Sequence, residues 1–87
     1  MSKHNNQKLS SFLQRALEED NLDLALKVLL TDQEQEEFTK RVQILSLLED
    51  GMTQREVSER LGVSLTTVTR GSKELQQYGD KLKNLLP

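Results

Sequence analysis

The side chains best suited to chemistry lie between Met52 and Leu75, in the stretch MTQREVSERLGVSLTTVTRGSKEL. Short hydroxyls can bond base edges or phosphates, threonine methyls can touch thymine methyls, and Arg or Lys can bind guanine or neutralise phosphate. An exposed set of this kind suits a groove of double-stranded DNA. We expect Gln54, Arg55 and Lys73 to hold phosphates. The full set of candidate DNA-binding residues is Gln54, Arg55, Leu65, Thr66, Thr67, Thr69, Arg70, Ser72 and Lys73.

Two short helices joined by a tight turn would present these side chains. Thr53 and Glu56 have the spacing of a capping box, which starts a helix. Gly62 can end that helix with a positive φ, and Ser64 can cap the next one. This order of signals predicts a helix-turn-helix, although a solvated helical hairpin that binds no DNA has similar spacing. The residues expected to pack inward are Val57, Leu61, Leu65, Val68 and Leu75.

Gly71 falls in the middle of the second expected helix. Glycine costs about 1 kcal/mol there relative to alanine, so a close approach to its backbone would explain it. A nucleic-acid phosphate or a small ligand stacked beside Arg70 could make that approach. An isolated, tolerated glycine is the plain alternative.

The rest of the chain is also expected to be helical, because glycine and proline are scarce and apolar residues recur at helical spacing. A helix over 22–30 would be apolar on most of its circumference, so we expect it to face a second copy of the chain. A capping box at Thr31 and Glu34 predicts a third helix that Gly51 ends. Its expected buried face is Phe38, Val42, Leu45 and Leu48.

These elements predict one all-α domain over residues 1–87. Residues 1–51 would form dimerisation helices, 52–77 the helix-turn-helix, and 78–87 a short last helix. A chain of 87 residues with 34% hydrophobic residues builds only a thin core, which favours a homodimer. Acidic residues concentrate away from the candidate DNA-binding segment: residues 1–51 hold six basic and ten acidic side chains, and residues 52–77 hold four and three.

Composition also limits the function classes. Without cysteine the chain has no thiolate nucleophile or zinc finger, and no nucleophile and base stand at a recognisable spacing. We therefore expect neither an enzyme nor a metal protein. No apolar run is long enough for a bilayer, and the N-terminal residues are polar, so a cytoplasmic protein with no membrane partner is expected.

From about Leu30 to Leu75 the chain resembles the bacterial Trp repressor family. The resemblance implies an intertwined, all-helical homodimer whose N-terminal helices interlock. It also implies operator DNA as a partner and L-tryptophan as the corepressor. The segments that carry it are LT at 30–31, RVQIL at 41–45, MTQRE at 52–56, LGVS at 61–64 and TVTRGS at 67–72.

The same resemblance implies a ligand site in which the indole lies between two arginines. Arg41 matches the arginine that lies beside the ligand carboxylate, and Arg70 matches the arginine that stacks on the indole. Both roles suit arginine, because a guanidinium can stack on a ring and can bind a carboxylate. Glu74 stands where the family commonly has a small residue near the ligand ammonium, so its carboxylate would either pair with that ammonium or be solvated. The implied ligand-binding residues are Val28 and Leu30 through their carbonyls, Thr31, Arg41, Arg70, Gly71 and Glu74.

Together these observations predict a homodimeric repressor that L-tryptophan activates to bind a palindromic operator. Two alternatives stay open. One is a DNA-binding regulator of the same fold that does not respond to tryptophan, because the stretch from Arg41 to Met52 is one residue shorter than in the enterobacterial pattern. The other is a helical dimerisation module that binds no DNA.

Overall fold

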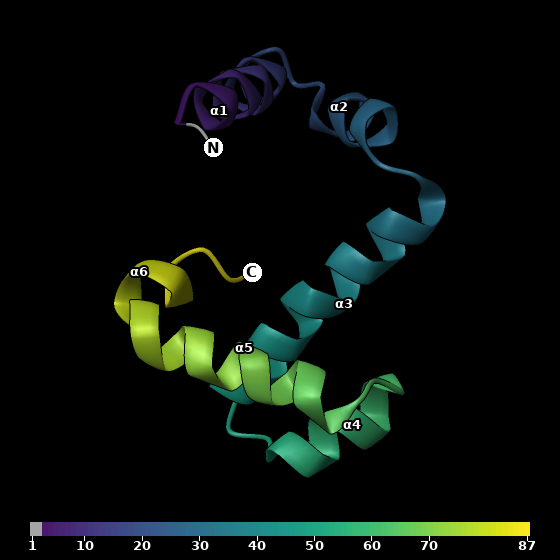
Figure 1. The fold of residues 1–87 in the computed structure, drawn as a ribbon, viewed down its shortest axis with the longest axis vertical. Coiled ribbons are helices and arrows are strands. Elements are labelled where there is room, and N and C mark those ends of the chain that lie inside the picture. The colour runs from purple at the N-terminus through teal and green to yellow at the C-terminus, as the bar shows by residue number, and fades with distance from the viewer. Residues whose placement is uncertain (1–2) are drawn as a thin grey trace. The chain divides into compact units, whose positions relative to one another are not determined.

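The computed structural model describes residues 3–87, and side chains from Gln7 onward. This part of the chain contains helices and no strand, which confirms the all-α prediction (Figure 1). None of its helices is long and apolar enough to cross a membrane. The helices fall into two compact units, one up to Glu36 and one over Glu37–Pro87. Their bounds are α1 (Lys3–Glu18), α2 (Leu22–Leu29), α3 (Asp32–Glu49), α4 (Gln54–Leu61), α5 (Leu65–Tyr78) and α6 (Asp80–Lys83).

The first unit contains α1, α2 and the first turn of α3. Helix α1 ends at Glu18, and Asp20 after it adopts a positive φ of 58°. The backbone N–H of Asn21 then donates to the carbonyl of Ala16 at 2.8 Å, closing the end of the helix. Ala25 is the buried residue of α2, whereas Val28 is 69% exposed. The single chain therefore leaves most of the apolar surface of α2 uncovered, as the sequence predicted.

Helix α3 starts and ends where the local signals predicted. The backbone N–H of Thr31 donates to the Glu34 carboxylate at 2.9 Å, and the N–H of Glu34 donates to the Thr31 hydroxyl at 3.1 Å. This is the predicted capping box. At the other end Gly51 has a φ of 100°, and the N–H of Met52 donates to the Leu47 carbonyl at 3.1 Å. A side chain at Gly51 would be strained in that conformation.

The core of the second unit forms where α3, α4 and α5 meet. Its buried residues are Ile44, Val57 and Val68. The prediction that Phe38 and Val42 belong to the buried face of α3 was wrong, since Phe38 is 47% exposed whereas Ile44 is only 2% exposed. The packing of α4 and α5 selects the side of α3 that carries Ile44, and periodicity along α3 does not reveal this side. Partly buried side chains around this core are Leu47, Leu48, Met52, Leu61 and Val63.

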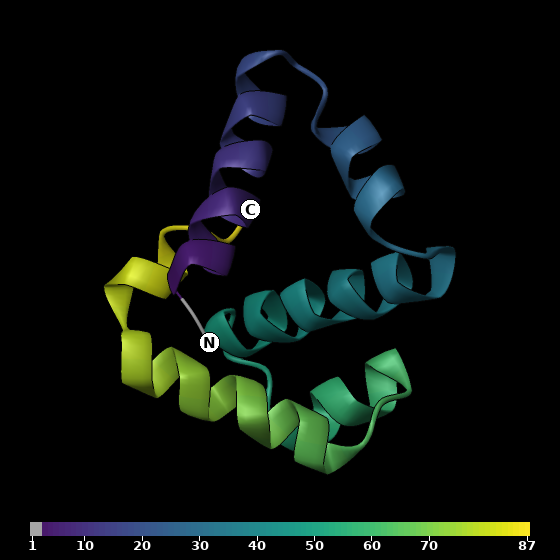
Figure 2. The same cartoon turned by 45° about the horizontal axis from the view of Figure 1, so that its top comes forward.

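The end of the chain is less helical than predicted. Helix α5 runs to Tyr78, one residue beyond the expected 77, and the ribbon then turns into the short α6 (Figure 2). Gly79, which follows Tyr78, has a φ of 57°. The following α6 is only four residues long, with Lys83 3.7 Å from the carboxylate of Glu49 on α3. Leu85, beyond this short helix, is 78% exposed in the single chain. Four residues form a single turn, and a helix that short depends on tertiary contacts.

Candidate nucleic-acid interface and ligand pocket

The first helix of the predicted pair, α4, begins with a complete capping box. The backbone N–H of Thr53 donates to the Glu56 carboxylate at 2.9 Å, and the Glu56 N–H donates to the Thr53 hydroxyl at 3.2 Å. The hydrogen bond from the Thr53 backbone, followed by the one with its side chain, lowers the pKa of the Glu56 carboxyl. The charged form of Glu56 therefore helps to fix the start of α4, next to Gln54 and Arg55.

The turn between α4 and α5 has the predicted chemistry. Gly62 has a φ of 67°, and the backbone N–H of Val63 donates to the Ser58 carbonyl at 3.2 Å. The Ser58 hydroxyl donates in return to the Val63 carbonyl at 2.6 Å, a bond that sequence reasoning missed. The Ser64 hydroxyl accepts from the N–H of Thr67 at 3.2 Å and so caps α5. These bonds hold α5 at a defined angle to α4.

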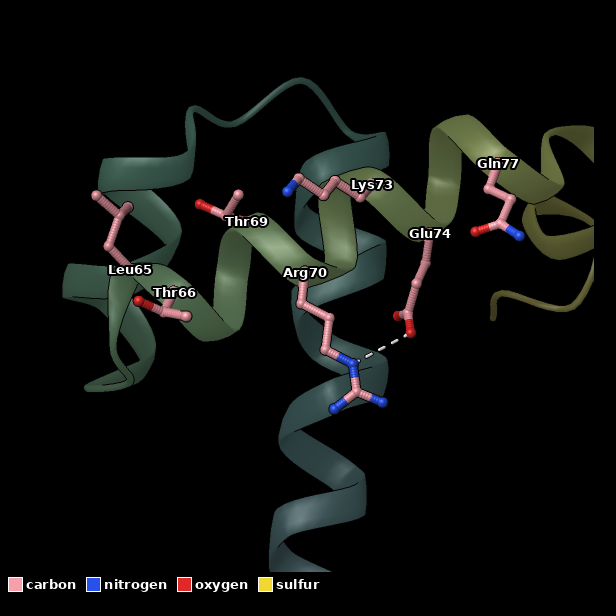
Figure 3. A pocket seen from close by; sticks show the side chains of 7 residues that line it. All are labelled: Leu65, Thr66, Thr69, Arg70, Lys73, Glu74 and Gln77. Carbon is pink, nitrogen blue, oxygen red and sulfur yellow. Dashed lines mark hydrogen bonds and ion pairs between the residues drawn. The ribbon is translucent and has the colours of Figure 1, made fainter.

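The outward face of α5 brings several predicted residues together. Leu65 was expected to pack inward, but it is exposed. Val68 and Leu75 are the side chains of α5 that face the core. The exposed face borders a hollow of about 520 Å³ (Figure 3). Gln77 also borders it; sequence reasoning missed this residue, although its spacing from Lys73 places it on the same side of a helix. The lining residues are Leu65, Thr66, Thr69, Arg70, Lys73, Glu74 and Gln77.

Other predicted DNA-binding residues have local partners. Thr67 lies with its Oγ1 2.8 Å from the Ser64 Oγ, so the two hydroxyls share a hydrogen bond at the start of α5. Thr69 donates its hydroxyl proton to the Oε1 of Gln54 at 2.7 Å. Ser72 is half-buried, and Arg55 is exposed on the first turn of α4. The structure therefore brings Gln54 and Thr69 into direct contact and leaves Arg55 facing solvent.

Arg70 and Glu74 form an ion pair on one side of α5. The Nε of Arg70 donates to the Oε2 of Glu74 at 3.3 Å. Figure 3 shows both side chains extending from the same side of α5, with their charged ends meeting. The Arg70 side chain is 66% exposed and the Glu74 side chain 37% exposed, so both remain accessible to a ligand.

A second hollow of about 480 Å³ lies between α3 and α5. It brings together four of the predicted ligand-binding residues, namely Arg41, Arg70, Gly71 and Glu74. Arg41 reaches this hollow from α3, and its Cζ lies 5.5 Å from the centroid of the Phe38 ring. The remaining predicted ligand residues, Val28, Leu30 and Thr31, belong to the first unit, where Thr31 caps α3. Sequence reasoning missed the other lining residues, which are Ile44, Leu45, Thr66 and Thr67.

The close approach expected at Gly71 is made by α3. A Cβ atom at Gly71 would lie 3.0 Å from the Cγ2 of Ile44 and 3.5 Å from the Cδ2 of Leu45. Real Cβ atoms rarely approach a neighbour so closely, so the glycine permits α5 to pack against α3. The same residue also lines the second hollow. Packing of the two helices is therefore sufficient to explain why glycine stands in this helix.

Comparisons with known proteins agree with this architecture. The family described as Trp repressor protein matches residues 4–87 of the chain. A Trp operon repressor homolog of Photobacterium profundum is 43% identical over 81 residues, covering 92% of this chain and 79% of the relative. A Trp operon repressor homolog of Vibrio campbellii is 38% identical over 85 residues, covering 92% and 85%. Another, from Vibrio cholerae, is 33% identical over 81 residues, covering 92% and 79%.

Proposed function

The chain belongs to the Trp repressor family, and from this premise we propose that it is a homodimeric repressor that L-tryptophan activates to bind a palindromic operator in the cytoplasm. The family consists of transcription regulators that are not enzymes. In this proposal residues 1–51 serve dimerisation, residues 52–77 bind DNA, and residues 78–87 form the short C-terminal helical segment. The observation that carries the proposal is that the hollow on the exposed side of α5 and the hollow between α3 and α5 share Thr66, Arg70 and Glu74.

The DNA-binding part of the proposal rests on exposed polar groups at the starts of α4 and α5. Helix N-termini attract phosphates because their backbone N–H groups are unpaired and the helix dipole is positive there. Gln54 and Arg55 occupy the first turn of α4, and Lys73 lies on the exposed side of α5. We assign these three residues to phosphates. The remaining DNA-binding residues, assigned to bases or the groove wall, are Leu65, Thr66, Thr67, Thr69, Arg70 and Ser72.

The ligand-binding part rests on the pocket between α3 and α5. A tryptophan carboxylate can pair with the guanidinium of Arg41 or Arg70, and the indole can lie on a guanidinium plane or against Ile44 and Leu45. A ligand at this position would contact both helices that set the orientation of α5. It can raise the affinity for DNA only if it binds the DNA-competent arrangement more tightly, and the coupling is then reciprocal. For Val28, Leu30 and Thr31 a ligand-binding role stays a prediction that rests on the family resemblance alone.

The dimer rests on uncovered apolar side chains of the first unit. Leu17, Leu24 and Val28 are more than half exposed in the single chain. Soluble monomers rarely leave contiguous apolar surface of this kind in water. A Val28→Asp variant is therefore expected to shift the protein from dimer to monomer in sedimentation equilibrium. Lys27→Asp, which adds the same carboxylate at a neighbouring charged position of α2, is the matched control and should leave the dimer intact.

The decisive experiment titrates a labelled duplex carrying a palindromic trp-type operator with the protein, with and without L-tryptophan. We expect tryptophan to lower the apparent Kd for the operator and to leave binding to a scrambled duplex weak. Equal affinity in both arms would support a regulator of the same fold that does not respond to tryptophan. A complete absence of binding to any duplex at low salt would support a dimerisation module without a DNA-binding role.

A further inference from the structure

The exposed side of α5 carries charges of both signs. The charged groups that line its hollow are the two basic side chains of Arg70 and Lys73 and the carboxylate of Glu74. The Nε of Arg70 lies 3.3 Å from the Oε2 of Glu74, whereas Lys73 points away from this pair (Figure 3). The surface proposed to face DNA therefore has one of its two basic groups already paired with a carboxylate of its own helix.

This carboxylate affects how a DNA phosphate can approach. Basic groups bind phosphates by releasing the counterions of DNA, and this contribution does not depend on the base sequence. While Arg70 is paired with Glu74, its charge is neutralised and it contributes little to that release. If a phosphate takes Arg70 instead, the freed carboxylate remains on the next turn of the same helix face. It then repels the phosphate, because residues four apart on a helix lie well within the screening length of about 10 Å at 0.1 M salt.

The contribution of the ion pair to the stability of α5 is small. It joins side chains that are 66% and 37% exposed, four residues apart on one helix. Exposed pairs of this kind stabilise a helix only weakly, and the order Arg then Glu is the less favourable one with respect to the helix dipole. Removal of the Glu74 charge is therefore expected to leave the fold intact and to change the charge that α5 presents to DNA.

We propose that Glu74 lowers the affinity of this protein for double-stranded DNA of any sequence by holding Arg70 back from the phosphates. This reduces the part of the binding that does not depend on sequence, so contacts with a particular operator contribute a larger share of the total. The inference rests on the proposed function, because it concerns the same DNA-binding face. It applies to the protein without any ligand.

Titration of a labelled scrambled duplex with the full-length protein, without tryptophan and at several salt concentrations, tests this inference. We expect Glu74→Gln to bind about tenfold more tightly than the wild type at about 50 mM salt, because the freed Arg70 adds one phosphate contact. The slope of log K against log salt concentration should become steeper by about one unit for the same reason. In an Arg70→Gln background, Glu74→Gln should change the affinity and the slope much less, since no guanidinium is left to free.

Glu49→Gln is the matched control. It breaks a second ion pair, in which the Oε1 of Glu49 lies 3.7 Å from the Nζ of Lys83, and neither residue lines the hollow. The change in net charge is the same as in Glu74→Gln, but the affinity for the scrambled duplex should stay close to that of the wild type. Circular dichroism verifies that each variant is folded.

Three results would overturn the inference and leave the proposed DNA-binding function standing. The wild type binds the duplex and Glu74→Gln binds it with the same affinity and slope; Glu49→Gln raises the affinity as much as Glu74→Gln does; or Glu74→Gln has the same effect with and without Arg70. If neither the wild type nor Glu74→Gln binds any duplex at low salt, the proposed DNA-binding function fails and this inference fails with it.

Discussion

The hydroxyl of Thr69 on α5 donates to the side-chain oxygen of Gln54, the first residue of α4, at 2.7 Å. This bond connects α4 and α5, the two helices of the proposed DNA-binding unit. The single proton of the Thr69 hydroxyl is used in the bond, whereas the amide group of Gln54 keeps both N–H donors. If Gln54 binds a phosphate as proposed, Thr69 is a positioning residue for it, because the bond fixes the Gln54 oxygen and leaves the amide N–H groups to donate.

Thr69→Val retains the shape of the side chain and removes this donor. We expect the free energy of unfolding to fall by about 1 kcal/mol, the usual net value of one hydrogen bond. Operator affinity should fall as well, because Gln54 loses its orientation. A double-mutant cycle with Gln54→Ala, followed by chemical denaturation and by DNA titration, measures the coupling. Strictly additive effects in both measurements would contradict the positioning role.

Gly71→Ala should destabilise the second unit. Alanine is the better helix former by about 1 kcal/mol, but inserting a methyl group into a packed contact costs about 1–3 kcal/mol. The new Cβ would meet Ile44, which is almost fully buried and has little room to move. We therefore expect Gly71→Ala to lower the urea concentration at the midpoint of unfolding. Ile44→Leu removes the Cγ2 atom that the new Cβ would meet, so Gly71→Ala should destabilise this variant less than the wild type. If Gly71→Ala destabilises both proteins equally, the contact with Ile44 is not the cause.

Arg55→Ala should weaken binding to every DNA sequence to a similar degree. Each phosphate contact contributes about 0.9 to the slope of log K against log salt concentration, so the slope should become shallower by about one unit. Titrations at several salt concentrations measure it. Arg60→Ala removes the same charge from the last turn of α4 and is the matched control. An unchanged slope in Arg55→Ala argues against a phosphate contact.

The capping box of α4 predicts a dependence of stability on pH. Because the Thr53 hydrogen bonds lower the pKa of Glu56 below its ordinary value, the folded state binds this proton less readily than the unfolded state. The stabilisation by Glu56 is therefore present above the unfolded pKa and is lost as the pH falls through the folded pKa. Glu56→Gln should lower the Tm at neutral pH and reduce its acid dependence. Glu59→Gln serves as the control, and identical pH profiles for the two variants would contradict this role of the cap.

Local signals in the sequence determined where the helices begin and end. The capping boxes at Thr31 and Thr53, the positive φ at Gly62 and the cap at Ser64 all appear where they were predicted. Each depends on backbone groups at most five residues apart, so the residue types alone specify it. The family resemblance, which rests on such short segments, was equally accessible and was confirmed by the match to residues 4–87.

Only the tertiary structure decided which surfaces meet. It selected Ile44 over Phe38 as the core residue of α3, assigned Gly71 to the contact between α3 and α5, and paired Thr69 with Gln54. These relationships depend on how α3, α4 and α5 pack against one another. Ridges on one helix can fit the grooves of another in several ways, so helical periodicity leaves several faces eligible for burial. The packing of these helices selects one face, and that choice also forms the pocket that holds Arg41, Arg70 and Glu74.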